Sequence, residues 1–136
     1  MNSTRVRYYT SLFLIGGIWN IGVSLSLLIL GSLLPSSFEL FGMAVPPTLF
    51  FFGGMMGFVF ALGIGYILVS RNIYENHAVV IAGGVIAKLM VFVNCAISVS
   101  FGQANAAVLA IGTIDLLFAV LFVEFLNSTR KEIGPH

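Results

Sequence analysis

The sequence contains few charged residues. Only 8% of its 136 positions are Asp, Glu, Lys or Arg, whereas 59% are hydrophobic, and the mean hydropathy is +1.07. A soluble domain carries about 25% charged residues, so this chain lacks the polar surface that a protein needs in water. The composition excludes an ordinary soluble domain and predicts an integral membrane protein in a lipid bilayer.

The sequence also lacks a large net charge of either sign, and it has only one cysteine. The net charge is +1, whereas a nucleic-acid-binding protein presents a clustered basic face, so no nucleic-acid partner is expected. Cys95 is the single cysteine, which excludes a disulfide within the chain and a Cys-x-x-Cys redox pair.

The residue patterns of common active sites and cofactor sites are absent as well. A haem held by two histidines needs both within the spans, but His77 lies at an interface and His136 near the end of the chain. A metal site needs several convergent ligands, and among acidic residues only Asp115 is central. The sequence has no Gly-rich phosphate loop and no Ser-His-Asp set. We therefore predict no catalytic residue, no metal and no cofactor, while a bound quinone or lipid stays open.

The sequence does contain four long apolar segments. They cover about residues 9–33, 47–70, 78–100 and 104–126, and each is long enough to cross a hydrocarbon core of about 30 Å. Backbone polar groups in lipid must be satisfied internally, so these spans should be helices. We predict an all-α, transmembrane four-helix bundle that forms a single integral membrane domain over residues 1–136. The first segment exceeds a signal peptide in length and no A-x-A site follows it, so we expect it to be retained.

The basic residues outside the spans all fall on one side of this bundle. They are Arg5, Arg7, Arg71, Arg130 and Lys131. The loops on the other side, at 34–46 and 101–103, contain none. Because cytoplasmic loops are enriched in Lys and Arg, both termini are predicted to be cytoplasmic.

Lys88 interrupts the third apolar segment, in "GVIAKLMVFVN". It lies roughly 15–20 Å from either end of a helical span, too far for its side chain to reach water. Asp115, in "AIGTIDLLFAV" of the next span, lies at nearly the same depth on the other side of a short turn. A charge at the bilayer centre costs about 2.5–3.5 kcal/mol even on the lenient insertion scale. We therefore predict that Lys88 and Asp115 pair inside the bundle, as ions or as a neutral couple that shares a proton.

Other polar and small residues are expected to gather around this pair. Asn20 of the first span lies near the same depth, so Asn20, Lys88 and Asp115 should form one intramembrane polar cluster. Candidates to line it are Trp19, Ser24 and Cys95. Small residues let membrane helices approach closely, and in the second span we expect the inward face to be the stripe Gly54, Gly57, Ala61, Gly65 and Leu68.

A second group of polar residues is expected at the cytoplasmic membrane surface. It consists of Arg71, Glu75, Asn76, His77 and Glu124. Glu124 is placed to meet Arg71 or a partner protein. The group is either a partner-binding interface or a solvated fringe that anchors the helix ends.

Several short patterns resemble a known family. They are "IWN" at 18–20, "GIGYILVSRN" at 63–72, "GGVIAK" at 83–88 and "FAVLFVEFL" at 118–126. In length, topology and the helix-end Gly-x-x-Tyr…Arg character, the chain resembles the DoxX-like small bacterial four-helix membrane proteins. This resemblance implies a multi-pass protein of the bacterial inner membrane, with accessory roles or links to quinone-dependent oxidoreductase complexes. It carries over no catalytic residues.

Two functions are compatible with these observations. The first hypothesis is a non-enzymatic accessory or scaffold subunit that works with a membrane-protein partner or as a homo-oligomer. The alternative is binding or transport of a small molecule, a proton or a quinone at Asn20, Lys88 and Asp115. An enzymatic activity is left open but is not favoured.

Overall fold

The structure is a computed structural model that describes the backbone of residues 1–133 and the side chains of residues 1–130. This part of the chain is helical and contains no strand. Four of its helices are long and apolar enough to cross a membrane: α1 (Ser3–Leu33), α2 (Phe50–Arg71), a helix over His77–Ser100, and α5 (Ala107–Ile133). The predicted all-α class with four candidate spans is confirmed.

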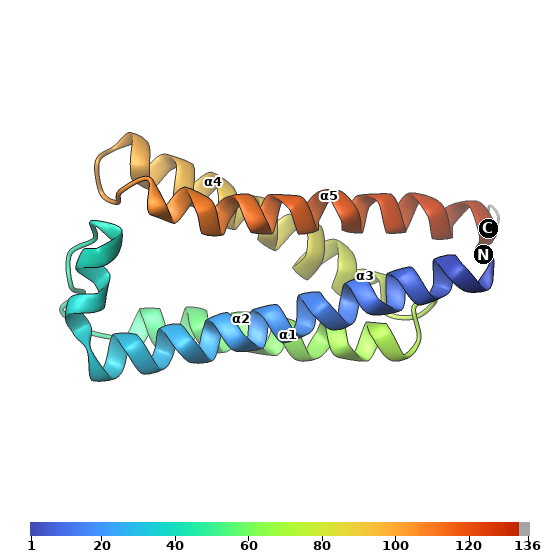
Figure 1. Ribbon diagram of the computed structural model, residues 1–136, viewed down its shortest axis with the longest axis horizontal. Coiled ribbons are helices and arrows are strands. Elements are labelled where there is room, and N and C mark those ends of the chain that lie inside the picture. The colour runs from blue at the N-terminus through green and yellow to red at the C-terminus, as the bar shows by residue number, and fades with distance from the viewer. Residues whose placement is uncertain (134–136) are drawn as a thin grey trace.

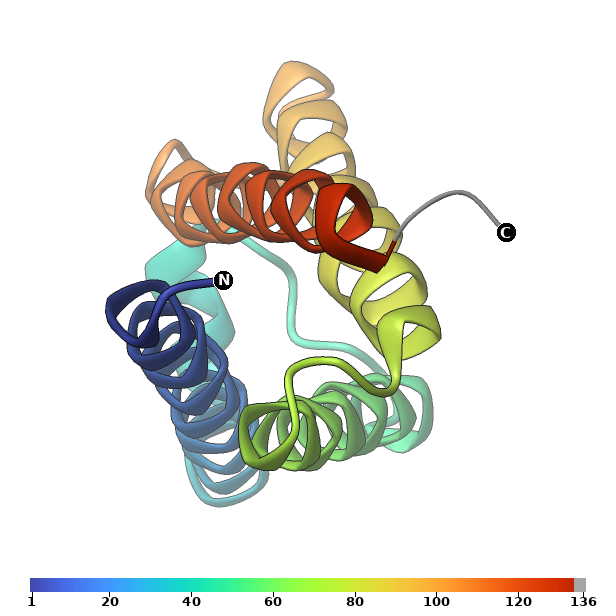
Figure 2. The ribbon, with the colours of Figure 1, turned by 90° about the vertical axis from the view of Figure 1, so that its right-hand side faces the viewer.

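The helices form two antiparallel hairpins, which we call the first hairpin (α1 and α2) and the second hairpin (α4, Ala87–Ser100, and α5). The N-terminus, the connector after α2 and the end of α5 lie together at the right of Figure 1, at what we call the terminal end. The 3₁₀ helix η1 (Pro35–Phe41) and the α4–α5 turn lie at the opposite, loop end. Viewed from the terminal end, the four spans form a ring in which α1 lies next to α5, and α2 lies next to the beginning of the third span (Figure 2).

The third span is not a uniform α-helix. It begins with α3 (His77–Val79), continues as a π-helix, η2 (Val80–Ile86), and becomes α4 one residue before Lys88. The hydroxyl of Tyr66 in α2 donates a hydrogen bond to the carbonyl of Gly83 within η2. A π-helix segment is rare and often occurs at functional sites. Here it contacts both α2 and α5, whereas α3 before it contacts α2 and α4 after it packs along α5.

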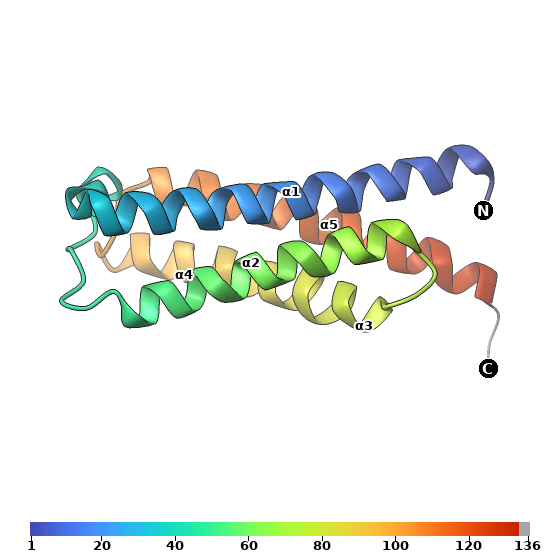
Figure 3. The same ribbon diagram turned by 90° about the horizontal axis from the view of Figure 1, so that it is seen from below.

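The first hairpin is held together by a close approach of two glycines. A Cβ added to Gly63 would lie 2.9 Å from the carbonyl oxygen of Gly17, and one added to Gly17 would lie 2.8 Å from that of Gly63. α1 and α2 therefore pack backbone to backbone at this point and run alongside each other in Figures 1 and 3. Small residues in membrane helices allow such contacts.

The expected inward stripe on α2 is wrong. Four of its members, Gly54, Gly57, Ala61 and Leu68, are exposed, and Gly65 is half-buried. The buried residues of α2 are instead Met56, Gly63, Tyr66, Val69 and Ser70. The physical reason is the Gly17–Gly63 contact, which turns a different face of α2 toward α1.

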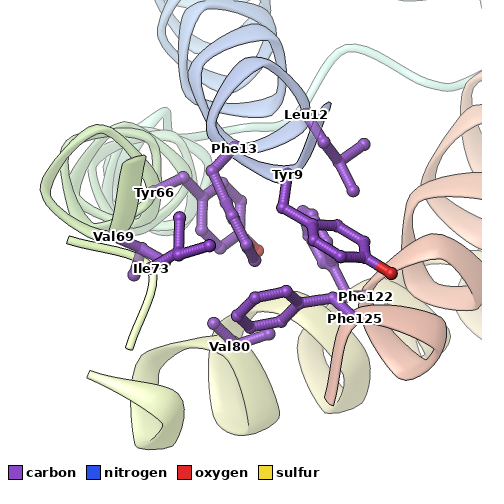
Figure 4. Packing of buried hydrophobic residues seen from close by; sticks show 9 residues of the cluster. All are labelled: Tyr9, Leu12, Phe13, Tyr66, Val69, Ile73, Val80, Phe122 and Phe125. Carbon is purple, nitrogen blue, oxygen red and sulfur yellow. The ribbon is translucent and has the colours of Figure 1, made fainter. Parts of the chain in front are cut away.

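An aromatic core joins the two hairpins at the terminal end (Figure 4). Tyr9 and Phe13 of α1 pack against Phe122 and Phe125 of α5, and all four side chains are at most 1% exposed. Phe13 stacks on Phe122 with ring centroids 4.9 Å apart and meets Phe125 edge to face at 4.8 Å. Tyr66 of α2 closes the core 5.1 Å from Phe122. Such aromatic pairs contribute about 0.5–1.5 kcal/mol each beyond the burial of their area.

A smaller contact joins the hairpins at the loop end. The backbone N–H of Asn105 donates to the carbonyl of Phe41 at 2.7 Å, and its side-chain amide donates to the carbonyl of Leu40 at 2.9 Å. The Oδ1 atom of Asn105 also accepts from the N–H of Ala107 at the start of α5. The hairpins are thus fixed to each other at both ends.

Candidate functional site

The three residues of the predicted polar cluster lie together in the middle of the bundle. The ammonium group of Lys88 in α4 forms an ion pair with Oδ1 of Asp115 in α5. The same ammonium donates a hydrogen bond to Oδ1 of Asn20 in α1 at 3.2 Å. Lys88 and Asn20 are both 4% exposed. One buried cation therefore binds its neighbouring helix and the opposite hairpin at once.

Aromatic rings complete the surroundings of the lysine. Its Nζ atom lies 5.1 Å from the ring centroid of Phe118 and 6.0 Å from that of Tyr66. A cation within about 6 Å of an aromatic face is attracted to it, and more strongly where water is excluded. These contacts add to the ion pair and help to hold the ammonium at mid-membrane depth.

Asp115 is the most accessible member of the cluster. Its side chain is 14% exposed, against 4% for Lys88, and the ion pair runs through one carboxylate oxygen, Oδ1. Asp115 lies about 12 Å along α5 from Ala107, well inside the candidate span. A polar molecule in the membrane would therefore meet the carboxylate before it met the lysine.

An apolar groove opens beside this cluster, between α1 and α5. Its volume is about 590 Å³, which lies in the range of about 300–1,000 Å³ that is usual for small-molecule sites. The lining residues are Ile15, Ile18, Trp19, Gly22, Val23, Ser26, Leu27, Ala110, Ile111 and Ile114. Trp19 and Ile114 directly precede Asn20 and Asp115, so the groove reaches the depth of the polar cluster.

A second, smaller cavity continues toward the loop end. Its volume is about 130 Å³, and Leu27 and Ile111 line both cavities. Phe38 and Phe41 of η1 and Met56 of α2 also line the smaller one. The groove and the smaller cavity therefore lie next to each other between the two hairpins, on the loop-end side of the polar cluster.

Trp19, Ser24 and Cys95 were the candidates to line the polar cluster, and of these Trp19 lines the apolar groove beside it. Ser24 is fully buried, and its hydroxyl donates to the carbonyl of Ile21 in its own helix. Cys95 is buried two helical turns from Lys88. It packs closely against Gly112 of α5, since a Cβ added to Gly112 would lie 3.3 Å from the Sγ atom of Cys95. Ser24 and Cys95 thus fill packing positions away from the polar cluster.

The predicted interface residues lie at the terminal end but do not form a single site. Arg71, Glu75 and Asn76 are exposed. His77 is half-buried and its ring meets Phe125 edge to face, with centroids 5.6 Å apart. This arrangement resembles a fringe at the helix ends more than a pocket.

Glu124 of the same group does not meet Arg71, since no ion pair joins these two described residues. Its Oε1 atom accepts a hydrogen bond from the hydroxyl of Tyr9 at 2.9 Å, and the same hydroxyl contacts Oγ of Ser128 at 2.9 Å. Glu124 therefore links α5 to α1 beside the aromatic core.

Two residues near the lysine were missed by the sequence analysis. Tyr66 and Phe118 both occur within the quoted "GIGYILVSRN" and "FAVLFVEFL" patterns, but an aromatic residue in a membrane span gives no sign of the direction in which it points. A tyrosine in the middle of an apolar run was the available signal, because its hydroxyl needs a partner when buried.

Comparison of the chain with known protein families, curated proteins and solved structures finds no match.

Proposed function

We propose that this protein binds one small amphiphilic molecule of the bilayer between its two hairpins. The hydrocarbon part of the ligand occupies the groove between α1 and α5, and its polar part lies at Asp115, next to Lys88 and Asn20. The single observation that carries this proposal is an apolar groove of about 590 Å³ that reaches the depth of the buried polar cluster, where its lining residues Trp19 and Ile114 directly precede Asn20 and Asp115.

The chemistry of the groove supports a ligand that comes from the membrane. Its lining offers only the hydroxyl of Ser26 and the indole N–H of Trp19 as polar side-chain groups. It extends from Ile15 to Leu27, or about 18 Å along α1, which suits an extended hydrocarbon chain. The cluster pairs one cation with one anion, which favours an uncharged head with hydrogen-bonding groups, such as a quinone or a neutral lipid.

A path for protons or water has less support. Such a path must reach one membrane surface, and toward the terminal end the aromatic core of Tyr9, Phe13, Phe122 and Phe125 fills the space between the hairpins. Binding is therefore favoured over transport across the membrane.

A second candidate is the non-enzymatic accessory or scaffold subunit of a bacterial inner membrane, in line with the DoxX-like resemblance. The observation that favours it is that Lys88 contacts both hairpins. A buried polar contact of this kind fixes which helices pack and in what register, and needs no ligand.

A variant that fills the groove separates the two candidates. A Cβ added to Gly22, which lines the groove, meets no atom within 4 Å, so Gly22→Leu should occupy the groove without disturbing the fold. Gly57→Leu is the matched control, because Gly57 is equally open but lies on α2 outside the groove.

The measurement is native mass spectrometry of protein purified from membranes in mild detergent. We expect the wild type and Gly57→Leu to carry a bound small molecule, and Gly22→Leu and Asn20→Leu to carry at least tenfold less. If the wild type carries no such molecule, or if Gly22→Leu retains it, the ligand-binding proposal fails and the accessory-subunit candidate is preferred.

A further inference from the structure

α4 has an uncovered outer face. It packs along α5 and continues from η2, whereas the contacts of α2 are with α3 and η2 instead. Figures 1 and 2 show α4 diverging from α2 toward the loop end. The face left open includes Met90, Val93 and Ile97, which are 63%, 46% and 48% exposed.

Asn94 lies on this open face. Its side chain is exposed, and within the described part of the chain it makes no hydrogen bond. It lies about 9 Å before the end of α4 at Ser100 and about 9 Å beyond Lys88. Asn94 is therefore at a depth where the surroundings of an uncovered helix are hydrocarbon.

Two exposed hydroxyl groups on the second hairpin behave differently. The hydroxyl of Thr113 donates to the carbonyl of Leu109 at 2.7 Å, and that of Ser100 donates to the carbonyl of Ala96 at 2.8 Å. Both are satisfied within their own helix. The amide of Asn94, with two donor hydrogens and an acceptor oxygen, is left without a partner, and a polar group transferred to an apolar medium without one costs about 1–3 kcal/mol on protein scales.

We propose that the face of α4 around Asn94 binds the same face of a second copy of this chain. A twofold axis along the membrane normal places both Asn94 side chains at equal depth, and a carboxamide is complementary to itself because it both donates and accepts. Closed twofold dimers are the most common oligomers, and Asn side chains associate membrane helices through hydrogen bonds. Any other partner would need a polar group at this particular depth.

This interface is independent of the proposed ligand site. The groove lies between α1 and α5, whereas the interface uses the side of α4 that faces away from α5. Two copies can therefore associate while each keeps its groove open to the bilayer.

Cysteine crosslinking in native membranes tests the interface. In a Cys95→Ala background, Met90→Cys places a thiol one turn from Asn94, whereas Val120→Cys places one on an outward position of α5 that is similarly exposed, at 60%. On mild oxidation we expect a covalent dimer from Met90→Cys and little from Val120→Cys. Adding Asn94→Leu to Met90→Cys should weaken dimerisation about tenfold, with the helical content unchanged.

Three outcomes would overturn the proposal. Equal crosslinking at positions 90 and 120 would indicate random collision. Unchanged crosslinking in the presence of Asn94→Leu would show that the amide has no part in association. A crosslink formed chiefly with a different protein would assign this face to another partner.

Discussion

The ion pair between Lys88 and Asp115 makes each residue dependent on the other. Lys88→Met leaves a carboxylate in the bundle without its cation, and Asp115→Leu leaves a lysine at mid-membrane depth beside Asn20. Breaking a buried pair from one side typically costs about 3–5 kcal/mol, whereas replacing both partners by apolar residues is often close to neutral. We therefore expect each single variant to lower the free energy of unfolding by about 3–5 kcal/mol and the double variant to lose less than either.

Reversible unfolding by titration with SDS in mixed micelles measures these differences. Thr113→Val, at an exposed position on α5 whose hydroxyl bonds only to its own helix, serves as a control for changes in polarity. Strictly additive losses in the double variant would mean that the two side chains do not depend on each other.

Much of this cluster follows from the sequence because depth along a membrane helix can be counted. The positions of Lys88 and Asp115 on either side of a short turn fix their relative height, and the cost of a lone charge in lipid then requires contact. Direction around the helix axis is harder to predict. Ser24 and Cys95 satisfy the spacing but fill packing positions, since serine can bond to its own backbone and cysteine behaves as a small apolar residue.

At the scale of elements, the crossing of α1 and α2 depends on Gly63. An added methyl group there would lie 2.9 Å from the backbone oxygen of Gly17, which cannot rotate away. Overpacking of this kind typically costs about 1–3 kcal/mol, so Gly63→Ala should destabilise the protein by that amount. Gly57→Ala should cause no loss, because its added methyl group meets no atom within 4 Å. Thermal unfolding in detergent compares the two, and equal midpoints would contradict the proposed close contact.

The same crossing explains why the face of α2 could not be predicted. The helix contains six glycines and alanines on more than one side, including Gly53, Gly54, Gly57, Ala61, Gly63 and Gly65, and the small-residue rule does not choose among them. The face of α2 that packs inward is set by α1, because the backbones of the two helices come close where Gly63 meets Gly17. The π-helix before Lys88 was likewise not predicted. The hydroxyl of Tyr66 in α2 donates to the carbonyl of Gly83 within it, a contact between helices that the sequence does not reveal.

At the scale of the whole molecule, three regions connect the hairpins: the aromatic core, the polar cluster and the loop-end contact of Asn105. The apolar space lies between the last two, where the hairpins are joined chiefly through Asn105 and η1. The hairpins are therefore joined by a large buried core in the terminal half, and the space for a ligand lies in the other half. This division explains how a chain of 136 residues can provide both a stable core and a groove.

The charges at the two ends of the molecule predict its orientation in the membrane. Arg5, Arg7, Arg71 and Arg130 all belong to the terminal end, so the positive-inside rule predicts that this end faces the cytoplasm. In a Cys95→Ala background, we expect a membrane-impermeant maleimide to label Gln103→Cys at the loop end in intact bacterial spheroplasts. Thr4→Cys at the terminal end should react only after the membrane is opened. Both positions are exposed, so a difference in labelling reports the side of the membrane and not burial, and the reverse pattern would place the termini outside.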